Sequence, residues 1–225
     1  MKHTIAALAA LSFLLPSQAA AQETIDVGVL KESEIAVVQN LLYPKKDQLE
    51  LGAHAGWMPF DAFTTTPIMS LTGVKHQSET LAFEVALGGG YGLKNNAYRT
   101  LEGEAYKVAP DAYRYLGSLL VDAQFSPIYA KMNWLGNRVF HHDIYVLGGA
   151  GLTVEQAIMP DNDLAFGPTA GVGIGARVFL SEASALRIQI RDDILIQSRE
   201  KTTDSRGVFV KQNVALTVGY VRLKK

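Results

Sequence analysis

The sequence predicts an all-β protein: an eight-stranded antiparallel transmembrane β-barrel behind a cleavable signal peptide and a short N-terminal periplasmic segment. Three observations predict this fold. Apolar and polar residues alternate along successive stretches of about ten residues, the length that a tilted strand needs to cross a bilayer. The connections between these stretches alternate between short and long. The polar faces of the stretches are rich in glycine.

The composition excludes several classes of protein. The chain has 21 basic and 22 acidic side chains, whereas a nucleic-acid partner would require a strong basic excess. It contains no cysteine, which excludes disulfides, thiolate metal sites and a lipidated N-terminal cysteine. Its hydrophobic fraction of 48% is ordinary for a soluble protein, so bulk composition alone does not indicate a membrane.

Residues 1–21 have the pattern of a signal peptide. Residues 1–3 carry positive charge, residues 5–15 are mostly apolar, and residues 19–21 offer a small-residue cleavage site. The apolar run is shorter than the roughly 18 residues of a membrane-spanning helix, and no later run approaches that length. We therefore expect export, followed by either a soluble extracytoplasmic protein or a barrel.

Residues 22–46 form a lead-in segment of different character. Ser33 could cap a short helix over residues 34–42, with Ile35, Val38 and Leu42 on one side, and Pro44 would end it. We expect this segment to cover the periplasmic end of the barrel; the alternative is a partner-binding segment.

The barrel is predicted over residues 47–225. In residues 48–57 the odd positions are apolar and the even positions are polar or small, which is typical of a strand with two different faces. The same alternation predicts further strands over residues 80–91, 115–125, 142–154, 171–180, 185–196 and 210–223. Residues 67–76 have no clear phase, and they are included because an even strand number closes such barrels.

The connections indicate the orientation of the barrel. Those at 77–79, 134–138 and 181–183 are short, and those at 59–66, 92–112, 155–164 and 198–206 are long. Outer-membrane barrels have short periplasmic turns and longer outer loops, so both chain ends are expected on the periplasmic side.

A secreted β-sandwich or a lipocalin-like barrel also alternates, so the polar face decides between these folds. It contains Gly88, Gly90, Gly149, Gly151, Gly171, Gly173 and Gly175. A face in contact with water has no reason to be so small, whereas the inside of a narrow barrel has little space. The glycines therefore favour a membrane barrel.

The predicted lumen holds charges of both signs. Its polar residues are Glu50, His54, Glu84, Asp122, Asp143, Arg177, Arg187, Arg191 and Asp193. Each unpaired charge would cost several kcal/mol, so we expect a hydrogen-bonded network that plugs the barrel; the alternative is an ion path or a proton-exchanging site. Asp192 is anomalous, because alternation directs it toward lipid unless a bulge, an interface position or another strand start intervenes.

Aromatic residues are expected to form two girdles at the membrane interfaces. The predicted outer girdle is Trp57, Tyr91, Tyr113, Tyr115, Phe166 and Phe209. The predicted inner girdle is Tyr129, Trp134, Phe140, Phe179 and Tyr220.

No catalytic or cofactor-binding motif is present in the sequence. His141 and His142 precede Asp143, but neighbouring residues of a strand point to opposite faces and cannot chelate one metal. A lipid-modifying enzyme would need a nucleophile–base pair, and the sequence offers no convincing one. We therefore expect no enzymatic activity, no cofactor and no metal.

Several segments resemble a known family. They are residues 49–51 with 59–63, residues 125–136, residues 142–151, residues 173–180 and residues 190–193. They are similar to the outer-membrane β-barrel domain proteins of myxobacteria and Bdellovibrio-like bacteria, over about residue 41 to the C-terminus. The resemblance implies an outer-membrane barrel without a defined activity. Many such barrels end in an aromatic residue, whereas here recognition by the insertion machinery would rest on Tyr220 and Leu223.

The sequence thus favours a structural or interaction component of the cell envelope, located in the outer membrane. Its expected partners are outer-membrane lipids, the barrel-insertion machinery and other envelope proteins. The long loop 92–112, with Tyr98 and Tyr106, is the candidate contact. A narrow pore for ions or small solutes and a lipid-modifying outer-membrane enzyme are the alternatives.

Overall fold

A computed structural model describes residues 42–104, 106–108, 110–134, 138–158, 163–202 and 205–224. The predicted signal peptide and most of the lead-in segment, including all but the last residue of its expected helix over 34–42, lie outside these residues.

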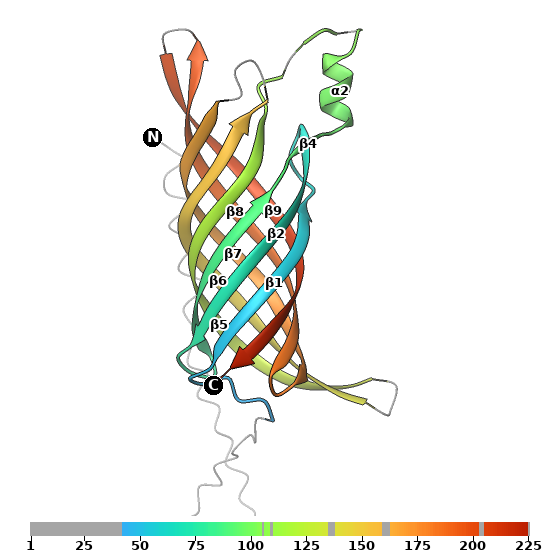
Figure 1. Cartoon of the computed structure of the whole chain (residues 1–225), viewed down its shortest axis with the longest axis vertical. Helices are drawn as coiled ribbons and strands as arrows, with labels where there is room; N and C mark the ends of the chain where they lie inside the picture. The colour runs from blue at the N-terminus through green and yellow to red at the C-terminus, as the bar shows by residue number, and fades with distance from the viewer. Residues whose placement is uncertain are drawn as a thin grey trace, which may run out of the picture. The chain divides into compact units, whose positions relative to one another are not determined.

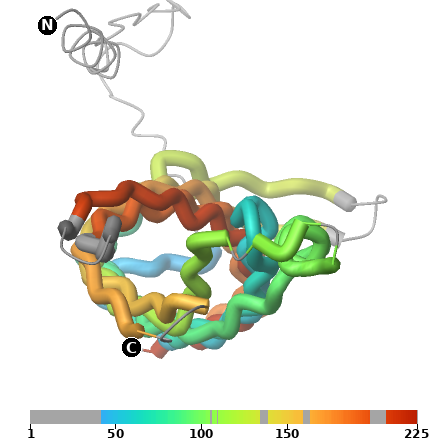
Figure 2. The backbone as a smooth tube through the Cα atoms, turned by 90° about the horizontal axis from the view of Figure 1, so that it is seen from above, coloured from blue at the N-terminus to red at the C-terminus, as the bar shows by residue number. Residues whose placement is uncertain are grey.

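Eight antiparallel strands close into a barrel, which confirms the predicted fold (Figures 1 and 2). They are β1 (Leu49–Met58), β2 (Thr64–His76), β3 (Leu81–Gly90), β5 (Tyr113–Trp134), β6 (Arg138–Ala157), β7 (Leu164–Ser181), β8 (Ser184–Thr202) and β9 (Ser205–Lys224). Each strand pairs with the next along the chain. The first and last strands also pair, from Leu49 with Lys224 to Trp57 with Leu216, and this pairing leaves no open sheet edge.

The weakest predicted strand is a full member of the ring. β2 pairs with β1 on one side and with β3 on the other. Its even positions, such as Thr66, Thr72 and His76, are buried, whereas Met69 and Leu71 are exposed. The phase was unclear from the sequence because small and polar residues occur on both faces of this strand.

Several connections are shorter than predicted. The predicted loop over 198–206 is wrong, because β8 continues to Thr202 and β9 begins at Ser205. Residues 155–157 likewise belong to β6 rather than to a loop. At one end of the barrel, the loop end, the β8–β9 hairpin rises beyond the ring near the connection between β3 and β5 (Figure 1). The β5–β6 hairpin extends past the opposite end. A hairpin that leaves the barrel keeps its backbone ladder but no longer needs one apolar face, so alternation does not mark it.

The long predicted loop over 92–112 contains regular structure. A two-residue strand β4 (Leu93–Lys94) pairs with the start of β2, and a helix α2 (Asn96–Glu102) follows. Asn95 caps this helix by accepting a hydrogen bond from the Tyr98 amide at 3.0 Å. Tyr98 is fully buried against Phe63, Ala112 and Ile158.

No helix among the described residues is both long and apolar enough to cross a membrane.

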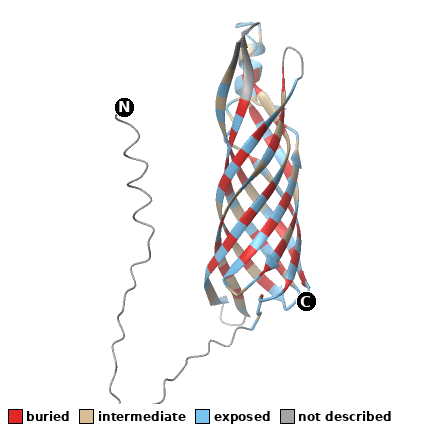
Figure 3. Cartoon of the chain, turned by 90° about the vertical axis from the view of Figure 1, so that its left-hand side faces the viewer, coloured by how far each residue is buried: buried red, intermediate tan, exposed pale blue. Residues whose placement is uncertain are grey.

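Buried and exposed residues alternate along every strand of the ring (Figure 3). The exposed apolar side chains include Leu51, Leu71, Leu87, Val121, Val146, Ile174, Ile188 and Val218, one from each of the eight strands. The inward positions carry most of the buried polar and charged residues. This distribution is the reverse of that in a water-soluble protein.

Only part of the predicted aromatic girdles faces outward. Trp57, Tyr91 and Phe166 are exposed near the loop end, and Tyr220 is exposed near the other end. Phe140 is half-buried on the outer face, and the Trp134 side chain lies outside the described residues.

The girdle prediction is wrong for Tyr115 and Phe179, whose rings are buried inside the barrel. Tyr113, Tyr129 and Phe209 also lie on the inner face, opposite Ala157, Asp143 and Gln197. In β5 the cause is two register shifts, between Tyr115 and Gly117 and between Phe125 and Ile128, which reverse the phase at both ends of the strand. In β7 and β9, Phe179 and Phe209 simply continue the alternation of their strands.

Asp192 lies on the outer face without any bulge. It pairs in register with Val172 and Val214, and no register shift lies near it. Its Oδ2 accepts a hydrogen bond from the Gln212 amide at 3.1 Å. A shifted phase is therefore excluded, and an outward carboxylate lies between the exposed Ile190 and Ile194.

We predict that Asp192→Asn stabilises the barrel in phospholipid vesicles by about 1 kcal/mol, because it removes a lipid-facing charge and keeps an amide that can bond Gln212. The midpoint of urea unfolding in vesicles measures this change. The matched variant Asp193→Asn should instead destabilise the protein, because the adjacent carboxylate points inward and pairs with Arg191. Equal effects of the two variants would contradict the opposite facing of these neighbours.

Candidate functional site

The barrel lumen gathers every polar residue that the sequence assigned to it. Each of the nine residues is at most 7% exposed. They come from β1 (Glu50, His54), β3 (Glu84), β5 (Asp122), β6 (Asp143), β7 (Arg177) and β8 (Arg187, Arg191, Asp193). Because these strands lie on different sides of the ring, their inward side chains can meet across the lumen.

Arg187 connects opposite walls of the barrel. Its Nη1 lies 3.1 Å from Oε1 of Glu50, and its Nη2 lies 2.8 Å from Oε2 of Glu84. Its Nε donates to the hydroxyl of Tyr145 at 3.0 Å, and Nη2 also donates to the Gln189 side chain at 2.8 Å. One fully buried guanidinium thus links β8 to β1, β3 and β6.

Arg177 forms a second crossing that shares Glu50. Its Nε lies 3.0 Å from Oε2 of Glu50, and its Nη1 lies 2.8 Å from Oδ2 of Asp143. Its Nη2 donates to the Gln124 side chain at 3.3 Å. His76 Nε2 lies 3.1 Å from the same Glu50 oxygen. Glu50 is therefore the common partner of two arginines and a histidine.

Tyr145 lies against both arginines. The guanidinium carbons of Arg177 and Arg187 are 5.2 and 5.0 Å from the centre of its ring, within the range of a cation–π contact. Gly175 makes room for this ring, because a Cβ there would lie 2.2 Å from the Tyr145 hydroxyl. The glycine-rich inner face thus leaves space for the large side chains opposite.

Arg191 forms a separate cluster nearer the loop end. Its two terminal nitrogens bond both oxygens of Asp122, at 2.7 and 3.0 Å, and its Nε pairs with Asp193. Gly149 and Gly171 again provide room, because a Cβ at either position would overlap the Asp122 or Asp193 carboxylate. Bidentate pairs of this kind hold both partners in a fixed geometry.

The end of the barrel where β1 begins and β9 finishes is closed by residues that precede β1. Lys45 is 2% exposed and pairs with Asp143. The ring of Tyr43 stacks on Phe179 with 5.3 Å between their centres. The backbone amides of Lys45 and Lys46 donate to the Glu79 carboxylate. The described part of the lead-in segment therefore covers this end.

At the loop end, Lys211 ties the β1–β2 connection to the inner wall. Its ammonium lies 2.7 Å from Asp61 and 3.0 Å from Glu155, which also accepts from Gln197 at 3.1 Å. Burial works against the ionised form of Asp61, but Lys211 and two backbone donors hold the pKa of this carboxyl below its ordinary value. The loop is thereby fixed over the wall of the lumen.

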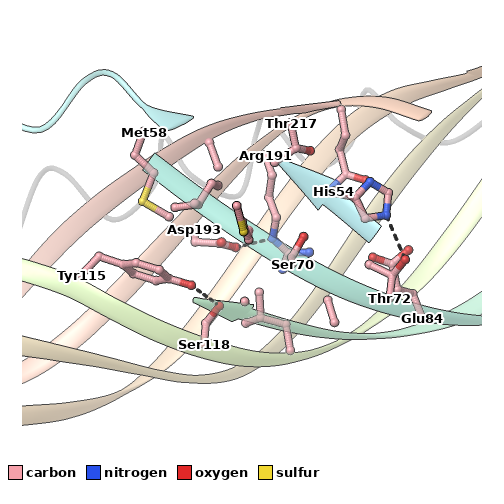
Figure 4. A pocket seen from close by; sticks show the side chains of 17 residues that line it. His54, Met58, Ser70, Thr72, Glu84, Tyr115, Ser118, Arg191, Asp193 and Thr217 are labelled. Carbon is pink, nitrogen blue, oxygen red and sulfur yellow. Dashed lines mark hydrogen bonds and ion pairs between the residues drawn. The ribbon is translucent and has the colours of Figure 1, made fainter. Parts of the chain in front are cut away.

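A small cavity of about 60 Å³ remains between the central network and the loop end (Figure 4). It has room for a few water molecules. His54 lies 3.0 Å from the Thr72 hydroxyl, and Tyr115 shares a hydrogen bond of 2.8 Å with Ser118. Among the described residues that line the cavity, no serine forms a hydrogen bond with an imidazole.

Metal ligation finds no support in the part of the chain that the structure describes: no three His, Cys, Asp or Glu side chains there are grouped to hold an ion. His141 is buried and lies 3.0 Å from the Tyr129 hydroxyl, whereas His142 is on the opposite face of β6.

Sequence reasoning missed several members of the network. Gln124 and Tyr145 lay on predicted polar faces, but they carry no charge and were not singled out. Lys45, Asp61 and Glu155 fell outside the predicted strands. No alternation marks these segments, so only their contacts identify them.

No protein-family model matches the chain, and no curated protein is similar to it in sequence. The resemblance to the barrel proteins of myxobacteria and Bdellovibrio-like bacteria therefore remains a prediction.

Solved structures with a similar arrangement include three barrels. The N-terminal β-barrel domain of Pseudomonas aeruginosa OprF is 11% identical, with a TM-score of 0.47, covering 80% of this chain and 98% of that one. Neisserial surface protein A is 12% identical, with a TM-score of 0.44, covering 78% and 95%. Ail of Yersinia pestis is 9% identical, with a TM-score of 0.41, covering 80% and 99%. At such values the likeness says nothing of what this chain binds or does.

We predict that Arg187→Met lowers the free energy of unfolding by about 3–5 kcal/mol, because it leaves Glu50 and Glu84 partly uncompensated in the lumen. Urea titration in vesicles measures the loss. Adding Glu84→Gln to this variant should recover part of it.

The control for this prediction is Lys94→Met. Lys94 forms an exposed ion pair with Glu102, whose loss should change stability by about 0–1 kcal/mol. If both methionine variants had the same small effect, the buried network would not be what holds the lumen together.

Proposed function

We propose that this chain is an outer-membrane β-barrel with a side-chain-filled lumen, and that it serves as a structural or interaction component of the cell envelope. The observation that carries the proposal is the inverted distribution of its side chains. Apolar residues are exposed on all eight strands, while two fully buried arginines and their carboxylates fill the interior.

The exterior supports placement in a membrane. Met69, Leu71 and Val172 are 74%, 62% and 66% exposed, and similar side chains surround the barrel. A soluble protein rarely exposes so continuous an apolar surface, whereas lipid would cover it. The closed ring leaves no unpaired strand edge in the hydrocarbon, as a membrane requires.

The connections support the orientation. Residues 77–80 and 182–183 form short turns at the end where β9 finishes, whereas α2 and its flanking segments lie at the other end (Figure 1). Short turns and chain ends are typically periplasmic in such barrels, so the end with α2 would face outward.

The interior supports a closed barrel over a narrow pore. Arg177 and Arg187 cross the lumen, and the cavity beyond them has room for only a few water molecules. Ion passage would require these buried pairs to separate, at a cost of several kcal/mol. We also propose that the barrel has no enzymatic role, since the sequence contains no catalytic motif.

The loop end supports an interaction role. Phe60, Leu93, Tyr106 and Val108 expose 73%, 52%, 62% and 52% of their surface there. At the other end, Tyr220 is exposed on the outer face of the last strand, whereas Leu223 is buried. We propose that outer-membrane lipids and other envelope proteins contact the exterior and the loops, and that the insertion machinery contacts Tyr220.

The location is tested by fractionation. We expect the protein in the outer-membrane fraction, and we expect unheated samples to migrate differently from boiled ones in gels, because the closed barrel resists detergent. Recovery as a soluble periplasmic or secreted protein would overturn the proposal.

The closed lumen is tested separately by planar-bilayer recording of refolded, heat-modifiable protein. We expect no conductance steps, because the ion pairs of Glu50 span the interior. Reproducible steps from wild-type protein would favour the narrow pore instead.

A further inference from the structure

A hollow in the form of a groove lies on the outer face of the barrel, away from the charged residues of the lumen. It measures about 860 Å³, within the range of about 300–1,000 Å³ typical of ligand pockets. It lies over β1, β2 and β3, and its outward-facing lining is Ala53, Pro67, Met69, Leu71, Leu87, Gly89 and Tyr91. All but the last of these side chains are entirely apolar.

The strand register explains the hollow. Gly89 of β3 lies beside Met69 of β2 and opposite Gly117 of β5. In this row of the outer face, neither β3 nor β5 therefore carries a side chain. One step further from the loop end, the same positions are filled by Leu71, Leu87 and Leu119. The missing side chains therefore leave a depression in an otherwise continuous apolar surface.

A positive charge lies at the loop end of this groove. The Arg114 guanidinium donates to the hydroxyl of Tyr91, and its carbon lies 4.8 Å from the centre of the Tyr91 ring. The Nε of Arg114 is buried and has no hydrogen-bond partner among the described residues. Among the described residues, no carboxylate forms an ion pair with Arg114. An apolar groove thus ends at an arginine that pairs with no carboxylate among the described residues.

We propose that this groove binds lipid A, with one fatty acyl chain along Met69, Gly89 and Leu87 and a phosphate on Arg114. The proposal rests on the proposed function, because outer-membrane placement puts the loop end in the leaflet that contains lipopolysaccharide. A guanidinium binds phosphate through two parallel donors, and the groove offers carbon contacts to a chain of methylene groups. Charge and shape therefore both match an anionic lipid.

The chain offers a matched pair of variants. A Cβ at Gly89 would meet its nearest neighbour at 3.8 Å, so Gly89→Leu should fill the groove without disturbing the strands. Gly73 also lies on the outer face, with its nearest neighbour at 3.9 Å, but it does not line the groove. Gly73→Leu is therefore the control, and Arg114→Gln removes the charge.

Binding is measured by native mass spectrometry of the full chain, refolded in detergent and titrated with lipid A. We expect one retained lipid A on the wild-type protein. Gly89→Leu and Arg114→Gln should each weaken binding about tenfold, and Gly73→Leu should not change it. Removing the lipid's phosphates should weaken binding to the wild-type protein but add little in Arg114→Gln.

Equal lipid A binding by all four proteins would overturn the inference, because it would reflect general coverage of the apolar exterior. Phosphatidylglycerol that bound as tightly, with the same sensitivity to both variants, would overturn lipid A as the occupant. Either result in heat-modifiable protein leaves the proposed function intact, whereas a chain that forms no detergent-resistant barrel contradicts the proposed function itself.

Discussion

The structure depends on the pairing of Glu50 with Arg177 and Arg187. Charges of both signs project into a lumen too narrow for bulk water, and each would be strongly unfavourable without a partner. The two guanidiniums reach Glu50 from β7 and β8 across the closing seam, and they also hold Asp143 and Glu84. Because the partners come from strands far apart in the sequence, the network forms only when the ring is closed and in register. The ion pairs thus specify one arrangement of the strands more than they add to the net stability of the barrel.

The apolar exterior and the charged interior constrain each other. A register slip of one residue would turn the inward side chains of the slipped strand toward lipid and its outward side chains into the lumen, so the two faces specify the same pairing. The glycines complete this constraint, since Gly175 leaves space for Tyr145 and Gly171 leaves space for Asp193. Asp192 is an exception on the apolar exterior. Its carboxylate faces outward without a bulge in the strand and accepts a hydrogen bond from Gln212. The ends are closed by other means, with Lys45 and Tyr43 at one and the Lys211–Asp61 pair at the other.

Much of this arrangement could be predicted from the alternation alone. It identified seven of the eight strands, whereas β2 was added because an even strand number closes such barrels. It also assigned to the lumen nine residues that the structure places inside. It failed where the period breaks: the register shifts of β5 turn Tyr115 and Tyr129 inward, and no local pattern announces a one-residue bulge. It also failed for hairpins beyond the barrel, such as residues 198–202, because an unbroken run of polar residues in the sequence resembles a loop. Lys45 and Asp61 could not be found at all, because their roles arise from long-range contacts of irregular segments.

The proposed placement requires that lipid covers the outer face of these strands. Because the chain has no cysteine, one cysteine introduced by substitution carries a single nitroxide label. The positions are Leu81, Phe83, Val85 and Leu87 of β3 and Tyr106 in the outer loop. Power-saturation EPR of the protein in vesicles then compares collisions with oxygen, which dissolves in lipid, and with a water-soluble nickel complex. If lipid covers these strands, oxygen collisions dominate at Phe83 and Val85, and collisions with the nickel complex dominate at Tyr106. Nickel collisions at Phe83 and Val85 as frequent as those at Tyr106 would contradict it.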